Sequence, residues 1–439
     1  MQVRHRMIRI LLSLFLAALL AGGGAAGAGE SAQGVDFAAS VALDMSSETV
    51  KAEARVHIFV DGDTTHFNVS DGAFPYGILK ARYIGVNTPE STGKVEPWGK
   101  QAARFTREKL EGAAGIIVES DTGEWNTDST GSRTLVWVWY TPDGTHWRNL
   151  NIELLQEGLA IANSSAQNRY GETCMAAIAQ ARAAGLRVYS GERDPEFYYG
   201  DAVEVTLREL RLNSGSYEGV KVAFEGVVTV NHSNSVYVEA LDEETGLHFG
   251  LPVYYGYNLS GGGMEILRAG NLVRIVGTFQ YYEAGDAWQV SGIAYRMMKP
   301  DDPGNIRLIS SGHDIPWTET DAAVLMEGTV AVEPDEEDEG YEEYEEFDRA
   351  FLSQATTVTV SPLTVQGGYT SIPGTATLWC LSGGTTVQLY LDGALNESGV
   401  PYTVDELRGK TVSVRGVVGK NNGEYQIYVL TPDGLEVLQ

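Results

Sequence analysis

The chain is poor in cysteine, in long apolar runs and in basic side chains. Its 439 residues include only two cysteines, Cys174 and Cys380. Two cysteines exclude a disulfide-stapled scaffold. Because they fall in different predicted domains, two separate buried thiols are the expected state. After the first 28 residues, no apolar stretch approaches the roughly 20 residues that a bilayer-spanning helix needs.

Basic residues are outnumbered, with 31 Lys and Arg against 59 Asp and Glu and a formal net charge of -28. That balance is the wrong sign for a protein that binds nucleic acid through its whole surface. The charge is unevenly spread, however. Residues 333–348 hold eleven acidic side chains and no basic one, whereas residues 54–200 hold 14 basic against 18 acidic side chains. A local cationic site can therefore exist within residues 54–200.

The first 28 residues have the pattern of a secretory signal peptide. Arg4, Arg6 and Arg9 precede an apolar segment at residues 10–20, and small residues at 26–28 offer a cleavage site. The apolar segment is too short for a membrane anchor. The sequence therefore predicts a secreted, extracellular protein from which residues 1–28 are removed.

Residues 54–200 alternate between strand and helix patterns after a small, polar linker at residues 29–53. Period-two alternation or short apolar runs predict strands at 55–60, 65–69, 78–86, 116–120 and 135–140. Helical spacing and terminal glycines predict helices at 97–111, 151–157 and 171–184. The expected fold is mainly β with some α: a five-stranded barrel with about three helices.

The second half contains an internal repeat of short strands with almost no helix signal. Residues 222–228 resemble residues 324–330, residues 241–251 resemble 381–391, and residues 270–277 resemble 409–416. We expect two further small barrels of the oligonucleotide- and oligosaccharide-binding (OB) type, at 201–300 and 321–439. A linker at 301–320 separates them, and the acidic stretch at 333–348 is an insertion in the second copy.

Two short motifs contain the residues that we expect to take part in catalysis. The first is Asp61-Gly-Asp63-Thr, which follows a predicted strand; the second runs from Arg82 to Glu90 and contains Asn87-Thr-Pro. Together they bring carboxylates, a guanidinium and a kinked loop into one neighbourhood. Metal-assisted attack on a phosphodiester needs such groups: oxygen ligands for a hard cation, a base for water, and a fixed positive charge for phosphate.

These motifs, in this order and at this spacing, resemble the staphylococcal-nuclease-like (thermonuclease) family over about residues 54–196. The resemblance implies calcium bound by the Asp63 carboxylate and the backbone carbonyl of Thr88, with Asp61 reaching the ion through water. Asn87 stands where the family commonly has Asp. It can still offer a carbonyl oxygen, but the site loses one negative charge.

The same resemblance assigns the catalytic groups. Glu90 matches the general base, and Arg82 and Arg133 match the two arginines that clamp the phosphate. A guanidinium suits this role because its planar donors meet two phosphate oxygens at once. The turn before Arg133 is one residue longer than the family pattern and lacks its Tyr.

The sequence therefore predicts a secreted calcium-dependent nuclease that acts on DNA and RNA, without membrane insertion and as a monomer. The alternative is a catalytically weakened binder of extracellular nucleic acid. A third hypothesis makes the C-terminal barrels glycan-binding anchors. Aromatic stretches at 254–257 and 279–282 either stack single-stranded bases weakly or pack within the barrel.

Overall fold

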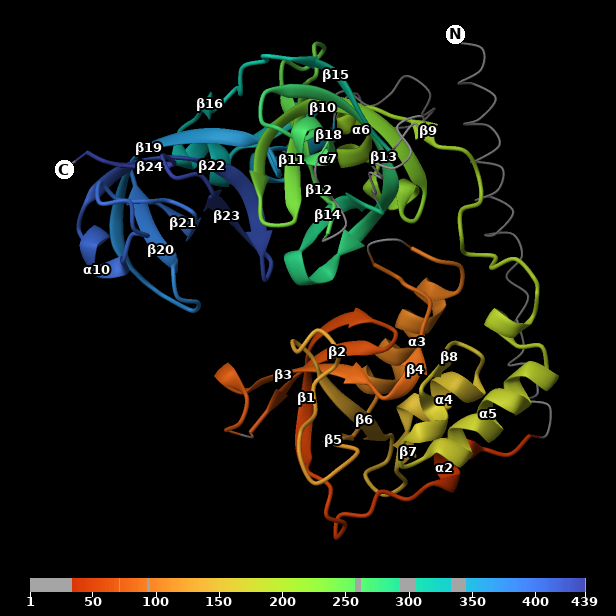
Figure 1. The fold of residues 1–439 in the computed structure, drawn as a ribbon. Helices are drawn as coiled ribbons and strands as arrows, with labels where there is room; N and C mark the ends of the chain where they lie inside the picture. Colours follow the sequence, from red (N-terminus) through yellow and green to blue (C-terminus); the bar gives the residue numbers. More distant parts are fainter. Residues whose placement is uncertain are drawn as a thin grey trace.

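The computed structural model describes residues 34–70, 72–92, 95–256, 262–292, 305–332 and 345–438. The predicted signal peptide and most of the acidic insertion lie outside these residues. None of the helices in these ranges combines the length and apolarity needed to cross a bilayer. Figure 1 shows one barrel with attached helices, in orange and yellow, and two C-terminal barrels, in green and blue, packed side by side.

The first barrel carries the helices. Its elements are α2 (Phe37–Ser40), β1 (Lys51–Asp61), β2 (Thr64–Val69), β3 (Ile78–Tyr83), β4 (Gly85–Asn87), α3 (Gly99–Glu111), β5 (Gly115–Glu119), β6 (Thr134–Thr141), β7 (Arg148–Asn149), α4 (Leu150–Gln156), β8 (Ile161–Asn163) and α5 (Gly171–Ala183). The strands join in the order β3-β2-β1-β5-β6, and β3 pairs with β6 to close the barrel. The expected mainly β fold, with its helical first barrel, is confirmed.

The two C-terminal barrels repeat the same closure. The green barrel comprises β9 (Val203–Glu204), α6 (Leu207–Leu212), β10 (Lys221–His232), β11 (Ser235–Leu241), β12 (His248–Tyr254), α7 (Gly262–Ile266), β13 (Asn271–Tyr282), β14 (Ala287–Ser291) and β15 (Ile306–Ser311). It closes through β13 and β10, and its third and fifth strands, β12 and β14, are parallel. That order, with the parallel pair, is the OB-type arrangement.

The blue barrel has the elements β16 (Thr318–Glu319), α8 (Ala322–Glu327), β17 (Thr329–Val332), β18 (Glu345–Asp348), α9 (Arg349–Leu352), β19 (Thr357–Tyr369), β20 (Thr375–Ser382), β21 (Thr385–Asp392), α10 (Val404–Leu407), β22 (Thr411–Asn421), β23 (Glu424–Val429) and β24 (Leu435–Val437). It closes through β19 and β22, and β21 and β23 are parallel. Cys380 lies in its core, whereas Cys174 lies in the core of the first barrel; both thiols are free.

Two segments of the second half differ from the pattern of the repeat. Residues 324–330, which resemble residues 222–228 in β10, lie in α8 and β17, and the first strand of the closed last barrel is β19. The expected linker at 301–320 also contributes a strand, since β15 pairs with β13. In both cases a short apolar run was compatible with more than one role, and packing against an existing barrel decided it.

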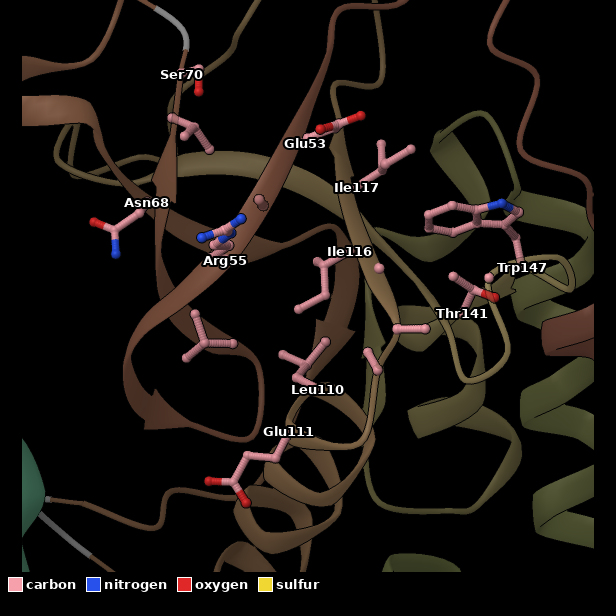
Figure 2. A pocket seen from close by; sticks show the side chains of 17 residues that line it. Glu53, Arg55, Asn68, Ser70, Leu110, Glu111, Ile116, Ile117, Thr141 and Trp147 are labelled. Atoms are coloured by element: carbon pink, nitrogen blue, oxygen red, sulfur yellow. The ribbon is translucent and has the colours of Figure 1, made fainter.

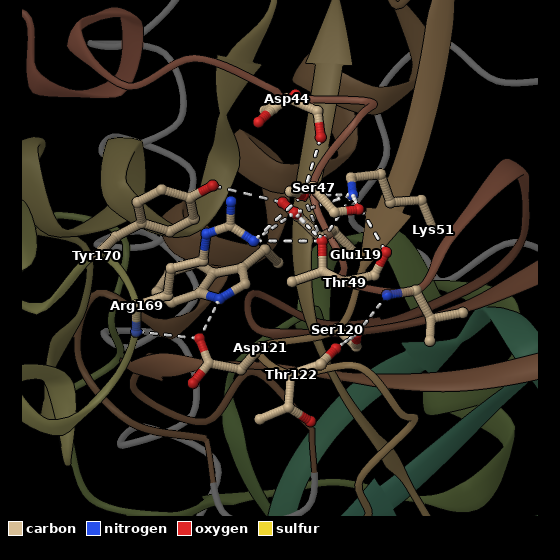
Figure 3. A network of polar contacts seen from close by, with 12 residues as sticks. Asp44, Ser47, Thr49, Lys51, Glu119, Ser120, Asp121, Thr122, Arg169 and Tyr170 are labelled. Atoms are coloured by element: carbon tan, nitrogen blue, oxygen red, sulfur yellow. Dashed lines mark hydrogen bonds and ion pairs between the residues drawn. The ribbon is translucent and has the colours of Figure 1, made fainter.

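The expected linker at 29–53 is tied to the first barrel by a buried carboxylate. Figure 3 shows Glu119, which is fully buried at the end of β5, accepting a hydrogen bond from Thr49 Oγ1 at 2.6 Å. Trp139 Nε1 donates to the same carboxylate at 2.7 Å. Arg169 Nη1 lies 3.2 Å from the same carboxylate, so the buried charge is compensated. The segment that precedes β1 is therefore part of the domain.

The two C-terminal barrels are joined by a buried arginine. Arg211, on α6, is 3% exposed. Its guanidinium donates to the Gly250 carbonyl at 2.7 Å and to the Gln354 side-chain and backbone oxygens, each at 2.8 Å. A Cβ on Gly250 would lie 2.2 Å from the carbonyl oxygen of Ala355, so only glycine permits this approach.

We predict that Arg211→Ala lowers the free energy of unfolding by about 3 kcal/mol, because buried carbonyls would lose their donors. Urea denaturation of the full chain measures this. The control is Arg408→Ala, whose side chain is 56% exposed and whose loss should change stability by less than about 0.5 kcal/mol. Equal effects of the two substitutions would contradict a joining role for Arg211.

Candidate functional site

The turn between β1 and β2 presents the first pair of carboxylates. Asp61 ends β1 and Asp63 precedes β2, and both are buried, at 7% and 5% exposure. Gly62 between them passes close to Thr88 and to helix α3, where a Cβ would lie 2.9 Å from Thr88 Oγ1. Thr106 Oγ1, on α3, donates to the Gly62 carbonyl at 2.6 Å. Helix packing therefore fixes the direction of the turn.

Arg82, on β3, joins the two predicted motifs. Its Nη1 pairs with Asp63 Oδ2, and its Nη2 donates to Asn87 Oδ1 at 2.7 Å. The backbone N–H of Thr88 donates to the same Asp63 carboxylate at 2.9 Å. The structure thus brings together the four residues Asp63, Arg82, Asn87 and Thr88, which are up to 25 positions apart in the sequence.

Asp61 is held by the loop that follows Thr88. Ser91 donates to Asp61 Oδ1 from its hydroxyl at 2.7 Å and from its N–H at 3.2 Å. Burial raises the pKa of Asp61 well above its usual value, and the hydrogen bond from Ser91 lowers the pKa only in part. The nearby carboxylates of Glu90 and Asp63 raise the pKa further. The carboxyl groups of Asp61, Asp63 and Glu90 are therefore close enough to interact electrostatically. The role of Ser91 has no signal in the sequence.

Glu90 is exposed, and its loop rests on the start of α3. The Glu96 N–H donates to the Glu90 carbonyl at 2.8 Å. Gly99 begins α3, and a Cβ there would lie only 2.2 Å from the Glu90 carbonyl oxygen. Asp194, which is 3% exposed, accepts the Trp98 N–H at 2.6 Å just before this helix begins. Gly99 and Asp194 were not identified from the sequence, although a glycine at a helix start is a usable signal.

Arg133 lies beside β3 because of the barrel closure. Arg133 immediately precedes β6, in which Leu135 is aligned with Arg82 of β3 in the parallel register. No contact between the two guanidiniums is formed; Arg133 Nε donates instead to Asp128 Oδ2 at 2.7 Å. Despite partial desolvation, hydrogen bonds from Thr130 and Arg133 lower the pKa of Asp128 to about 2. Asp128 therefore anchors Arg133 in the longer turn.

The donors around Asp63 fit a hard cation chemically. A carboxylate of Asp63, the amide oxygen of Asn87 and the oxygens of Thr88 are the ligand types that calcium takes, and Thr88 Oγ1 is buried without a hydrogen-bond partner in the described residues. Within those residues, no three Asp, Glu, His or Cys side chains form a metal-holding group. Arg82 already spans Asp63 and Asn87, so a cation would compete with it.

A separate recess of about 790 Å³ lies at the other end of the first barrel (Figure 2). It is bordered by the start of β1 and the end of β2, with Glu53, Arg55, Asn68, Ser70 and Trp147 among its lining residues. None of the predicted catalytic or metal-binding residues lines it. The candidate site is therefore defined by the clustered side chains near Asp63 and not by this cavity.

Comparison with known families identifies one region of the chain. Residues 80–190 match the family described as staphylococcal nuclease homologue. The match contains Arg82, Asn87, Thr88, Glu90 and Arg133, whereas Asp61 and Asp63 precede it. No curated protein matches the chain. The match supports the family and leaves the role of each site residue as a prediction.

We predict that Gly99→Ala destabilises the protein by about 1–3 kcal/mol, because the added methyl group has to displace the Glu90 loop. Helix propensity alone would make Gly99→Ala stabilising, because alanine ordinarily stabilises a helix relative to glycine. A lower free energy of unfolding would therefore indicate the close contact with the Glu90 loop. The control is Gly72→Ala, where a Cβ meets nothing within 4 Å. Chemical denaturation of both variants measures the difference, and a neutral or stabilising Gly99→Ala would contradict the close contact.

Proposed function

We propose that this chain, which carries a staphylococcal nuclease homologue domain at residues 80–190, is a calcium-dependent phosphodiesterase that cleaves DNA and RNA. The observation that carries the proposal is the contact of Arg82 with Asp63 and Asn87, beside the Glu90 loop. This arrangement supplies a positive group for phosphate, oxygen donors and an exposed carboxylate in one place. The family match agrees with that chemistry.

In the proposed reaction, a water molecule attacks phosphorus in line with the departing 5′-oxygen. Glu90 accepts the proton of the water, since its exposed position lets it face solvent and substrate together. Arg82 and Arg133 donate to the non-bridging oxygens, where negative charge develops in the transition state. The position of Arg133 directly before β6, the strand that pairs with the strand of Arg82, supports this assignment.

Asp63, Asn87 and the Thr88 carbonyl would hold the calcium ion, with Asp61 acting through water. When bound, calcium supplies Lewis-acid polarisation of the phosphate and lowers the pKa of a coordinated water. The protein residues supply orientation. Ser91 holds Asp61, and the Thr88 N–H holds Asp63, so both carboxylates keep fixed directions.

We further propose that the protein is secreted. The support is the arginine-rich start, the short apolar segment at residues 10–20 and the small residues at 26–28. In an extracellular setting, calcium is available to a weak site.

We predict that Glu90→Gln and Arg82→Ala each lower kcat/KM on single-stranded DNA by at least about a hundredfold, the scale for losing a positioned base or a charge-stabilising donor. Rates are measured with calcium and with a chelator, which should abolish the wild-type activity.

Glu111→Gln and Arg55→Ala, at exposed positions away from Asp63, are the matched controls and should retain the wild-type rate. A near wild-type rate in Glu90→Gln would refute its assignment as the base. A wild-type protein that binds DNA without cleaving it would favour the non-catalytic alternative.

We predict that calcium affinity is weak in the wild-type protein and rises about tenfold in Asn87→Asp, because the site regains one carboxylate. Isothermal titration calorimetry measures the dissociation constant. Asn68→Asp, at an exposed position on β2, adds the same charge elsewhere and controls for net charge. Unchanged affinity in Asn87→Asp would show that Asn87 does not face the ion.

A further inference from the structure

A cleft of about 410 Å³ lies between the first barrel and the green barrel. Asp61 and Ser91 form one end of it, and Lys100, on α3, and Phe59, on β1, form one wall. The opposite wall is the end of β13, with Gln280, Tyr281 and Tyr282. The cleft therefore begins at the candidate catalytic site and ends on a different barrel.

Ion pairs hold the two walls together. Arg107 pairs with Glu283 through both terminal nitrogens, one of them at 3.0 Å, and its guanidinium carbon lies 4.4 Å from the ring centroid of Phe59. Lys100 Nζ lies 3.4 Å from Glu218 Oε1. These contacts define the separation of the walls, so the cleft is part of the folded molecule.

Gln280 is the unexplained group in this cleft. It is 4% exposed, and neither its amide nitrogen nor its amide oxygen has a hydrogen-bond partner in the described residues. The preceding residue, Phe279, points into the barrel core, so Gln280 lies on the outer face of β13. Leaving a buried amide unpaired costs free energy. A ligand with an adjacent donor and acceptor would satisfy it.

Two tyrosines line the same cleft. Tyr282 lies two residues after Gln280, so both belong to the outer face of β13, and its side chain is 39% exposed. Tyr281 is held by Asp286 Oδ1, to which it donates at 2.6 Å, and its ring lies 5.3 Å from that of Trp288. Exposed, preorganised aromatic rings beside a polar edge suit a stacked nucleobase.

The charges around the cleft favour a base over a phosphate. Lys100 is paired with Glu218, Arg107 with Glu283, and Arg104 with Glu196 at 2.7 Å. Each cation along this wall is thus compensated by a carboxylate, which leaves little net charge for phosphate binding. Stacking and hydrogen bonding to a base need no net charge.

We propose that this interdomain cleft binds one unpaired nucleobase of the substrate strand, with Gln280 hydrogen-bonded to the base edge and Tyr282 stacked on its face. The proposal rests on the nuclease function proposed above, because Asp61 and Ser91 connect the cleft to the catalytic loop. It gives the green barrel a direct part in holding single-stranded substrate.

The test measures binding separately from cleavage. Single-stranded DNA of about twelve nucleotides, within the usual site size of such proteins, is labelled with fluorescein and titrated by anisotropy in the presence of a chelator. A second strand of equal length carries abasic sites throughout. We expect the full-length mature protein to bind the intact strand more tightly than the abasic strand.

Gln280→Met and Tyr282→Ala should each weaken binding of the intact strand about tenfold and reduce the preference over the abasic strand. Gln366→Met and Tyr369→Ala, at exposed positions on β19, are the matched controls and should bind like wild type. Gln280→Met should also keep or raise thermal stability, since it removes an unpaired buried amide.

Two outcomes separate the hypotheses. If wild-type protein cleaves DNA with calcium but both cleft variants bind the intact strand within twofold of wild type, base binding in the cleft is refuted and the nuclease function stands. If wild-type protein shows the expected base preference but no cleavage with calcium, the nuclease function fails while the cleft remains a base-binding site.

Discussion

All three barrels contain a parallel pairing of their third and fifth strands, and in the first barrel this pairing lies beside the candidate site. In the first barrel, this pairing aligns Ala81 with Thr134 and Arg82 with Leu135. It brings the turn that ends at Arg133 beside the strand that carries Arg82, although the two arginines are 51 positions apart in the sequence. The same pairing in the other barrels joins Val253 to Val290 and Leu389 to Ile427, without cationic neighbours in those strands. The same topology therefore positions a candidate catalytic site in the first barrel. In the two C-terminal barrels, the paired strands contribute residues to the hydrophobic core.

The sequence was informative where local chemistry decides the structure. The helices and strands of residues 54–200 follow from apolar spacing and terminal glycines, and the three barrels follow from repeated short strands. It was less informative where packing decides. The apolar run at 324–330 fits a strand by pattern, but the barrel that it packs against makes it part of a helix and an edge hairpin.

For the candidate site, too, the sequence predicts some features and not others. The motifs place Asp63, Asn87, Thr88 and Arg82 in one neighbourhood, because each lies within one residue of a strand end. Their partners depend on three-dimensional contacts that no short pattern contains. The exchange of a carboxylate for Asn87 could be read from the sequence, but its hydrogen bond with Arg82 could not. Ser91, Gly99 and Asp194 act through contacts of the same long-range kind.

The buried contact between the two C-terminal barrels has an evolutionary consequence. Gly250 admits the Ala355 carbonyl only because it lacks a side chain, and Arg211 donates to oxygens contributed by both barrels. The two repeats are therefore no longer interchangeable units. A gene rearrangement that kept the green barrel and lost the blue one would leave the Arg211 guanidinium without its two Gln354 acceptors. Loss of the blue barrel would therefore also destabilise the green one.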